Sequence, residues 1–416
     1  MQIPHLGTIE LSYIKKVYYL MLDNQFLLSL RPTSIANINY KIILMYVIDP
    51  DRNKPWNGLP LLPPEEEYYR TLPIMERLIG ARIALAKLKE QSDSLPNPGI
   101  MVTTITLQEA RQSSAIENVF TTDDELYKVF SESIEIREGP TKEIINYRKA
   151  IFEGFNYLKD QGLNKNVIVD LYRMIKNESD GIREHEIWIT GINEVTKERV
   201  RVYTPPSDKF ILEEKLDNLI DFITNDDKYK VDPVLKMIVG HAQFEAIHPF
   251  KDGNGRTGRI LNVLILTMKE VLSDPILYLS GYINRTKDDY YYHLGNVTKN
   301  GNWQAWINYM LKAVQDTAYV TYDKIASIHS SMKEAQNTLA ETNFKKQHQL
   351  IEKIYTQPFT TVKHLTKSND NPGGLYSENT SRNYLAELTK IGMLQKVNIG
   401  GNHYFKNVQL TNILQQ

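Results

Sequence analysis

The sequence predicts a mainly α-helical protein with one β-hairpin near its middle and a second hairpin near its C-terminus. Apolar residues recur at the spacing of a helical face over much of the chain, for example across residues 65–91. Two segments, 186–204 and 392–406, instead have the pattern of strands joined by short turns. No unbroken apolar run reaches about 18 residues, so we expect no membrane span and a cytoplasmic protein.

The composition limits the classes of protein and of chemistry that need to be considered. The chain of 416 residues exceeds one ordinary domain, and two or three domains are expected. Its 49 basic and 50 acidic residues give a net charge of −1, so no overall positive field favours nucleic acid. The absence of cysteine excludes disulfides, thiolate metal ligands and a thiol nucleophile.

Residues 1–50 form an N-terminal extension of uncertain role. The apolar run from Val17 to Leu22 is interrupted by Asp23, which argues against a signal peptide. One interpretation is an extension without function, with Met45 as the true start. The alternative is a strand or helix that packs on the main body, and loss of solubility on trimming to Met45 would favour it.

Several helices are predicted between residues 65 and 176. In the first, Pro73 marks either a kink or the true start of the helix. The second ends in the hexapeptide Ser113–Asn118, and Thr122–Glu125 is a capping box that opens a further helix. The remaining helical patterns are separated by turn residues. The predicted helices cover residues 65–91, about 103–116, 142–158 and 164–176.

Residues 187–204 are predicted to form a β-hairpin around Asn193 and Glu194. A lone hairpin is marginally stable unless it packs on another element. Because it lies in a mainly helical chain, upstream of the stretch that carries the chemistry, we favour a flap that contacts a substrate. A plain connecting hairpin is the alternative.

A helix is predicted to lead directly into the central stretch of the sequence. Asp232 is its N-cap, Pro233 takes the first helical position, and apolar residues continue to Ile247. His248 therefore lies at the exit of this helix. Two further helices are expected at 288–297 and 303–315, followed by a long polar helix near 317–349 that we interpret as a linker.

The last seventy residues have the pattern of a winged helix. A helix capped by Ser377 precedes two strands, which pair across the turn Gly400–Asn402. Residues 345–416 hold nine Lys and Arg against four Asp and Glu, a mild positive excess. DNA binding and protein docking both remain open for this segment.

The chemistry of the sequence is concentrated in residues His248–Arg259. The turn Gly253–Gly255 can cradle an anion, and a helix start presents free N–H groups and a positive dipole end to phosphate. Asp252 is a hard oxygen ligand suited to Mg²⁺. Arg256 and Arg259 share one face of the following helix and can clamp phosphates. His248 can take a proton from an attacking hydroxyl. Together these residues indicate nucleotide chemistry.

This stretch resembles the signature of the Fic-domain family, HPFx[D/E]GNGRxxR, and meets every fixed position. The resemblance extends upstream through His241–Ile247 and covers roughly residues 51–315. Fic proteins are mostly α-helical enzymes that usually transfer AMP from ATP to a Ser, Thr or Tyr hydroxyl of a target protein. The resemblance implies that the hairpin is the flap that binds the target segment by β-augmentation. It also implies His248 as general base, Asp252 as Mg²⁺ ligand, Gly253, Asn254 and Gly255 as anion hole, Arg256 and Arg259 as phosphate ligands, and Phe250 as loop anchor.

The resemblance gives a role to the hexapeptide Ser113–Asn118 as well. It fits the inhibitory pattern [S/T]xxxE[G/N] of the class with an N-terminal inhibitory helix, with Ser113 and Glu117 at the fixed positions. In that class the glutamate pairs with the second signature arginine, here Arg259. Such pairing removes a γ-phosphate contact, and ATP then lacks its productive geometry.

Three functional hypotheses follow. The first is an autoinhibited protein adenylyltransferase that binds ATP and Mg²⁺, acts on a target protein and modifies itself; Tyr282 and Tyr291 are its candidate adenine contacts. The second adds removal of AMP with the help of Glu117. The third is a DNA-binding regulator whose core senses a nucleotide. The oligomeric state, a homodimer included, is left open. The expected domains are the extension (1–50), a helical region with the inhibitory helix (51–140), the Fic core (141–315), a helical linker (316–344) and the winged helix (345–416).

Overall fold

The computed structural model describes residues 51–94, 98–122, 138–192, 196–399 and 401–415. Four expectations lie wholly or partly outside this part of the chain: those for residues 1–50, for the capping box at 122–125, for the turn at Asn193 and for the turn at Gly400. Within the described residues, no helix has both the length and the apolar composition that crossing a membrane requires.

The N-terminal helices agree with the predicted ones, with shifted ends. Pro73 lies in the first turn of its helix, so it marks the start and not a kink. Asn164 caps the fourth helix by accepting a hydrogen bond from the backbone N–H of Val167 at 3.1 Å. The elements are η2 (Glu66–Tyr68), α3 (Leu72–Asp93), α4 (Pro98–Ile116), α6 (Pro140–Gln161) and α7 (Lys165–Lys176).

Two helices form the buried centre that positions the site. Every residue of α9 (Pro233–Ile247) from Val234 onward is buried, as is nearly all of α10 (Asn254–Met268). They pack on each other, on α6 and on α8 (Lys209–Thr224). The prediction contains no helix at residues 209–224, although the spacing of Leu212, Leu216 and Leu219 is helical. The N-cap predicted at Asp232 is confirmed, because its side chain accepts from the N–H of Val234 at 2.8 Å.

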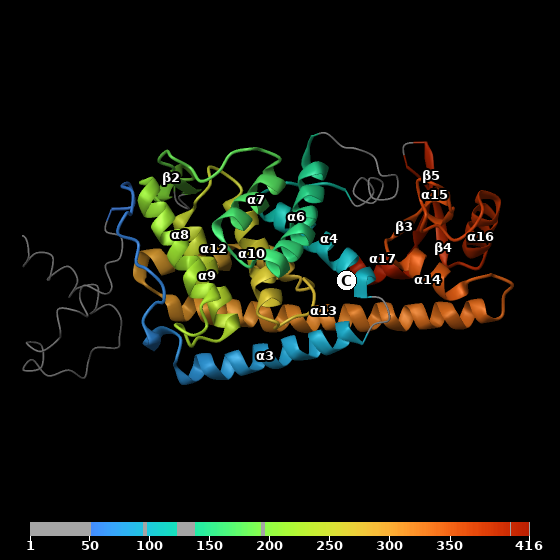
Figure 1. The fold of residues 1–416 in the computed structure, drawn as a ribbon, viewed down its shortest axis with the longest axis horizontal. Coiled ribbons are helices and arrows are strands. Elements are labelled where there is room, and N and C mark those ends of the chain that lie inside the picture. Colours follow the sequence, from blue (N-terminus) through green and yellow to red (C-terminus); the bar gives the residue numbers. More distant parts are fainter. Residues whose placement is uncertain (1–50, 95–97, 123–137, 193–195, 400, 416) are drawn as a thin grey trace, which may run out of the picture. The chain divides into compact units, whose positions relative to one another are not determined.

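The predicted hairpin is confirmed as the antiparallel pair β1 (Ile189–Ile192) and β2 (Arg199–Tyr203) (Figure 1). Its base is held on the core, since the Tyr203 hydroxyl donates to the carbonyl of Ala246 in α9 at 2.9 Å. This contact supplies the support that a lone hairpin lacks.

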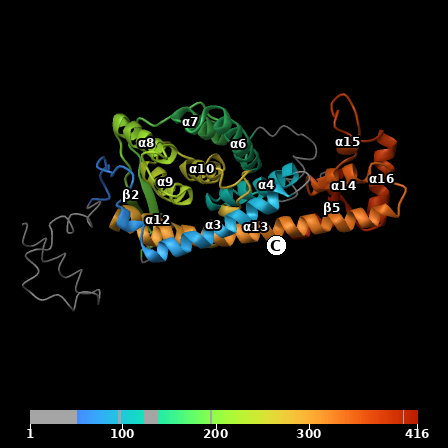
Figure 2. The ribbon, with the colours of Figure 1, turned by 60° about the horizontal axis from the view of Figure 1, so that its bottom comes forward.

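Residues 303–340 form one continuous helix, α13 (Trp303–Ala340), which corrects the prediction of two helices with an end near Gln349. Its buried face runs through the expected break near Thr317 without a helix-breaking residue, and the helix packs along α3 (Figure 2). The short helices α11 (Leu279–Arg285) and α12 (Lys287–Asn300) precede it.

The C-terminal segment contains the predicted helix and hairpin in a three-stranded antiparallel sheet of order β3-β5-β4. Ser377 caps the helix as expected. This arrangement is compatible with a winged helix. Two helices that the prediction lacks flank it, α14 (Gln347–Tyr355) and α17 (Val408–Gln415). The other elements are β3 (Phe359–Thr360), α15 (Val362–Leu365), α16 (Glu378–Lys390), β4 (Leu394–Ile399) and β5 (Asn402–Asn407).

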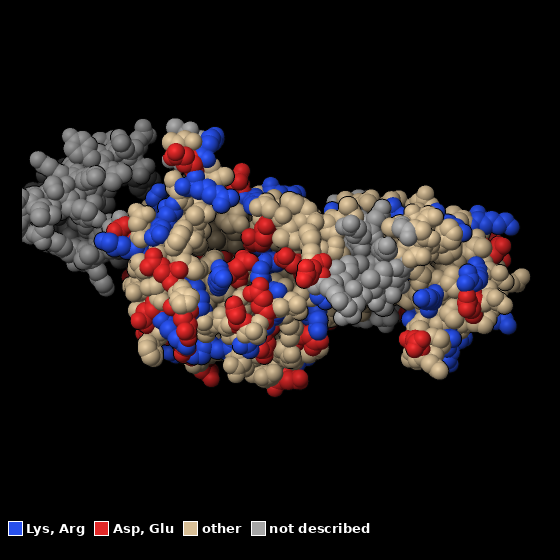
Figure 3. Space-filling model, turned by 90° about the horizontal axis from the view of Figure 1, so that it is seen from above, with Lys and Arg blue, Asp and Glu red and all other residues tan. Residues whose placement is uncertain are grey.

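The charges of α16 are balanced within the helix. Its two basic residues pair with acidic residues of the same helix: Arg382 with Glu378 at 2.5 Å, and Lys390 with Glu387 at 3.9 Å. On the face seen in Figure 3, Lys and Arg are interspersed with Asp and Glu. The mild positive excess of this segment is therefore not concentrated on α16.

Candidate active site

The loop between α9 and α10 is shaped by two residues in the left-handed region and by one asparagine. His248 ends α9 with φ 49° and ψ 59°, and Gly253 precedes α10 with φ 78°. The Asn254 side chain closes the loop by accepting from the N–H of Phe250 at 2.9 Å and donating to its carbonyl at 2.8 Å. The Phe250 ring is buried and stacks on Tyr172 with 4.0 Å between ring centroids. The predicted anchoring by Phe250 agrees with this packing.

His248 is held in the protonation state of a general base. Its Nδ1 lies 3.2 Å from the carbonyl oxygen of Glu245, which can only accept, so Nδ1 carries the proton and Nε2 has a free lone pair. The ring keeps some exposed surface, yet the surrounding protein lowers the pKa of His248 to about 4 because desolvation disfavours the imidazolium. The imidazole is therefore neutral at pH 7.

Arg183, which sequence reasoning did not single out, fixes the loop from the side of the flap. Its Nε donates to the His248 carbonyl at 2.8 Å, and its backbone N–H donates to the Pro249 carbonyl at 2.9 Å. Its other guanidinium nitrogens donate to the carbonyls of His185 and Pro206, on either side of the hairpin. One buried arginine thus joins the catalytic loop to both ends of the flap. No local motif marks this residue.

Asp252 is an exposed carboxylate that is paired with a lysine. Its side chain is 66 % exposed, and its Oδ2 lies 2.7 Å from the Nζ of Lys176 in α7. Burial alone raises the pKa of Asp252, but Lys176 and the N–H of Gly253 outweigh it and lower the pKa. No group of three or more His, Cys, Asp or Glu that could hold a metal occurs among the described residues. A single exposed carboxylate still fits Mg²⁺, which keeps most of its waters and binds phosphate oxygens.

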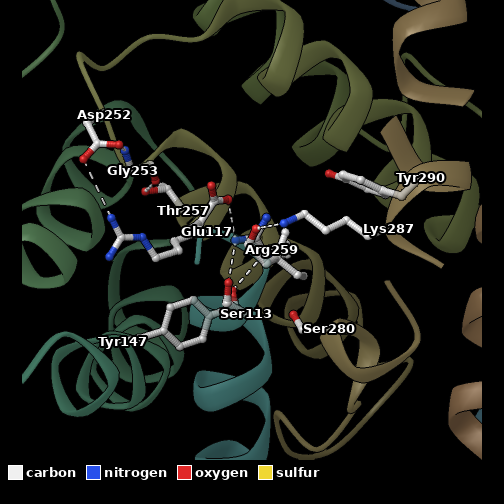
Figure 4. A network of polar contacts seen from close by, with 12 residues as sticks. Ser113, Glu117, Tyr147, Asp252, Gly253, Thr257, Arg259, Ser280, Lys287 and Tyr290 are labelled. Atoms are coloured by element: carbon white, nitrogen blue, oxygen red, sulfur yellow. Dashed lines mark hydrogen bonds and ion pairs between the residues drawn. The ribbon is translucent and has the colours of Figure 1, made fainter. Parts of the chain in front are cut away.

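Arg259 is enclosed by the C-terminal end of α4. Its Nη2 lies 2.8 Å from Glu117 Oε1 and donates to the Ser113 carbonyl at 2.9 Å, while its Nε donates to Ser113 Oγ at 2.8 Å (Figure 4). The predicted pairing of Glu117 with Arg259 is therefore present. Burial raises the pKa of Glu117, but the Arg259 guanidinium outweighs burial and lowers it, so Glu117 is a carboxylate at neutral pH.

The Glu117 carboxylate also fills the space in front of the helix start. A Cβ added to Gly255, the second residue of α10, would lie 2.5 Å from Glu117 Oε1 and 2.9 Å from Arg259 Nη1. The absent side chain of Gly255 is thus what lets a negatively charged group approach the first turn of α10. Backbone N–H groups at a helix start favour an anion there, and in this structure the anion is Glu117.

Arg256, the other signature arginine, is also paired. Its side chain is 4 % exposed and its Nη1 is bonded to Oε2 of Glu143, in the first turn of α6. Its Nη2 lies 3.9 Å from Asp252 Oδ2. The two arginines therefore lie side by side at the start of α10, each facing a glutamate from a different upstream helix. Glu143 was not among the predicted site residues.

The two candidate adenine contacts lie in different surroundings. Tyr291 in α12 is 45 % exposed and packs edge-on against Tyr290, with 5.2 Å between the ring centroids. Tyr282 in α11 packs instead on Tyr309 of α13 at 5.9 Å. Burial raises the pKa of both tyrosines. The charges of Glu117 and Arg259 shift the pKa of Tyr291 in opposite directions, whereas those of Lys312 and Asp316 do so for Tyr282.

A buried polar network lies behind Arg259. Glu109 of α4 accepts hydrogen bonds from the Ser280 N–H at 2.9 Å, from the Ser280 hydroxyl, and from the Tyr147 hydroxyl at 3.4 Å. Burial raises the pKa of Glu109 to about 7. This network attaches α4 to α6 and α11, which positions Ser113 and Glu117 for their contacts with Arg259.

Three sequence families match successive parts of the chain. Residues 75–156 match the Fic/DOC family N-terminal domain, residues 162–266 match the Fic/DOC family, and residues 332–410 match the C-terminal domain of SoFic-like protein adenylyltransferases. The second match contains all of the signature residues and the flap.

Curated relatives match over limited lengths. The chain is 27 % identical over 145 residues to protein adenylyltransferase fic-1 of Caenorhabditis elegans, which covers 35 % of this chain and 26 % of the relative. It is 26 % identical over 173 residues to a probable protein adenylyltransferase of Aquifex aeolicus, covering 41 % of this chain and 44 % of the relative. The chain thus spans less than half the length of these relatives.

The solved structures that match this chain include two Fic proteins. A Fic family protein from Desulfovibrio desulfuricans matches with a TM-score of 0.49 and 16 % identity, covering 82 % of this chain and 98 % of the other. Fic-1 from C. elegans matches with a TM-score of 0.47 and 19 % identity, covering 62 % and 74 % of the two chains.

Proposed function

Because the chain belongs to the Fic family, we propose that it is a protein adenylyltransferase that transfers AMP from ATP to a Ser, Thr or Tyr hydroxyl of a target protein. The observation that carries this proposal is the position of a neutral His248, with Nε2 free, at the loop that leads into α10. A base, an anion-binding helix start and two arginines occur together there.

The proposed reaction uses His248 as the proton acceptor. The target hydroxyl oxygen forms a bond to the α-phosphorus of ATP while the bond from that phosphorus to the bridging oxygen breaks, and pyrophosphate leaves. Nε2 of His248 takes the hydroxyl proton, which requires the neutral imidazole described above. The start of α10 would stabilise negative charge on the phosphates through its N–H groups and dipole.

Asp252 would hold the Mg²⁺ that accompanies ATP. A bound Mg²⁺ neutralises charge on the phosphates and on the leaving pyrophosphate. The carboxylate is exposed and already faces the ammonium of Lys176, a cation that Mg²⁺ would displace. Arg256 and Arg259 would bind the phosphates once their carboxylate partners release them.

We propose further that Glu117 inhibits the enzyme in its resting state. Its carboxylate neutralises Arg259 and occupies the space in front of Gly255, where a phosphate would approach the helix start. ATP must then bind with its γ-phosphate displaced, and a misplacement of about 1 Å can lower a rate by about 100-fold. The flap, fixed to the loop by Arg183, would present the target hydroxyl to His248.

The test is transfer of label from ATP labelled at the α-phosphate, with Mg²⁺, to proteins of a cell lysate and to the enzyme itself. We expect the Glu117→Gly variant to incorporate at least about 100-fold more label than the wild type, because Arg259 becomes free to bind phosphate. The double variant Glu117→Gly, His248→Ala should incorporate none, because no base remains.

Label from the γ-phosphate serves as the control for the reaction type. Transfer of AMP leaves that label in pyrophosphate, so the purified enzyme, incubated without lysate, should not carry it. If the Glu117→Gly variant labels no protein with the α-phosphate, itself included, the proposed activity is wrong.

A further inference from the structure

We propose that Glu143 is a second inhibitory carboxylate, which occupies Arg256 as Glu117 occupies Arg259. This inference rests on the proposed function, because it assigns to Arg256 the binding of ATP phosphates. It assigns two inhibitory carboxylates to the resting site: Glu117, which directly follows α4, and Glu143, in the first turn of α6.

Arg256, a proposed phosphate ligand, is instead bound to a carboxylate in this structure. Nη1 is bonded to Glu143 Oε2, and Nη2 lies 3.9 Å from Asp252 Oδ2, beyond hydrogen-bond distance. Nε is buried and has no hydrogen-bond partner among the described residues. A buried guanidinium with an unused donor is costly, and an anion bound at the start of α10 would satisfy it.

Three cations of the site are each paired with a carboxylate in this structure. Lys176, Arg256 and Arg259 contribute three positive charges, and the carboxylates that pair with them are Asp252, Glu143 and Glu117. A paired arginine attracts the ATP polyphosphate weakly, whereas removal of either glutamate leaves one arginine with an uncompensated positive charge. Glu117 accounts for one of the two neutralised arginines, and Glu143 accounts for the other.

The surroundings of Glu143 allow it to leave. Its side chain is 36 % exposed, whereas that of Arg256 is 4 % exposed, so the carboxylate is the mobile partner of the pair. Glu143 lies in the first turn of α6, which begins after Gly139 (φ 97°) with Pro140 at its start. The positive end of its own helix stabilises the carboxylate after it swings into solvent. The arginine has no such alternative.

A consequence is that release of Glu117 alone leaves the site half inhibited. In the Glu117→Gly variant Arg259 is free, but Arg256 is still neutralised by Glu143. The two substitutions should therefore act on different phosphate contacts, and the double variant should bind ATP more tightly than either single variant.

Nucleotide binding tests this inference without relying on turnover. The His248→Ala, Glu117→Gly background prevents transfer, and the dissociation constant for ATP with Mg²⁺ is measured by calorimetry with and without Glu143→Gln. We expect Glu143→Gln to tighten ATP binding by about tenfold, the change that one charge-assisted hydrogen bond produces. AMP, which lacks the β- and γ-phosphates, should gain much less.

Glu153→Gln is the matched control, because it makes the same chemical change on the same helix, about 15 Å further along its axis. It should leave the affinity for ATP unchanged. Should Glu143→Gln fail to fold, Glu143→Ala removes the same carboxylate and carries the same expectation.

Weaker or unchanged ATP binding in the Glu143 variants would overturn the inference, since Glu143 would then orient Arg256 or merely stabilise the fold. An equal gain for ATP and AMP would overturn it too, because a phosphate-specific lock predicts a difference. Absence of AMP transfer would contradict the proposed activity and would leave this binding result standing.

Discussion

The proposed role of His248 as a base depends on the backbone around it as much as on its ring. The left-handed conformation at the end of α9 turns the residue out of the helix, and the Glu245 carbonyl fixes the proton on Nδ1. Arg183 holds the His248 carbonyl, so the loop cannot relax without breaking several hydrogen bonds. The result is a base that is neutral and oriented before any substrate binds.

This arrangement predicts that the proposed AMP transfer continues at an unusually low pH. Because the pKa of His248 is lowered to about 4 from the usual 6.5, kcat/KM of the Glu117→Gly variant should stay nearly constant from pH 8 down to about pH 5. It should fall only as the imidazole becomes protonated near pH 4. The measurement is a pH profile of AMP transfer, with circular dichroism at each pH to show that the protein is folded. A midpoint near 6.5 would contradict the described environment of the ring.

At the scale of elements, the C-terminal half of α4, the helix that we propose to be inhibitory, is held by α11 and α12. Glu109 is bonded to Ser280, and Asn284 donates to Gln112 at 2.7 Å. At its C-terminal end, the Nζ of Lys287 donates to the Ile116 carbonyl at 2.5 Å, one residue before Glu117 (Figure 4). A cation at the end of a helix satisfies its unpaired carbonyls and stabilises its last turn.

Loss of this cation should loosen the inhibitory contact. We expect Lys287→Met to raise the AMP transfer of the otherwise wild-type enzyme by about tenfold, which corresponds to the loss of one hydrogen bond to a charged group. The measurement is the initial rate of label incorporation. Lys299→Met, on the exposed surface of the same helix, is the control and should leave the rate unchanged. A rate that falls in Lys287→Met would show that Lys287 serves the reaction and not the inhibition.

At the scale of the whole molecule, the core around α9 and α10 contains carboxyl groups that are favoured in their protonated form. Burial raises the pKa of both Glu109 and Glu245 to about 7. Between pH 4.5 and 7 the folded state therefore holds more protons than the unfolded chain. The stability linked to these protons is fully present below pH 4.5 and is lost as the pH rises through 7.

Replacing Glu109 by glutamine should remove its share of this pH dependence. The stability of Glu109→Gln relative to the wild type should increase as the pH rises from 4.5 to 8, by up to about 3 kcal/mol for one such group. Chemical unfolding at several pH values measures this difference. Glu245→Gln should change in the same direction. A difference between variant and wild type that is independent of pH would show that the carboxyl group is not protonated in the fold.

The parts of this protein that could be predicted from the sequence are those encoded by neighbouring residues. The exit of α9 at His248, the glycine turn and the start of α10 lie within twelve residues, and their types specify the turn and the anion-binding helix end. The hairpin at 189–203 and the cap at Asp232 are equally local. Glu117 required family resemblance in addition, because its partner Arg259 lies 142 positions away.

Only the tertiary structure decided which distant charges meet at this site. Glu143 reaches Arg256 across 113 positions, Lys176 reaches Asp252 across 76, and Arg183 joins the flap to the catalytic loop. The structure likewise placed Tyr291 against Tyr290 and Tyr282 against Tyr309 of α13. Periodicity and turn chemistry determine local conformation, whereas ion pairs between helices depend on how those helices pack, which no local pattern records. The sequence by itself therefore determined the catalytic loop, and the packing of α4, α6 and α7 decided how its charges are neutralised at rest.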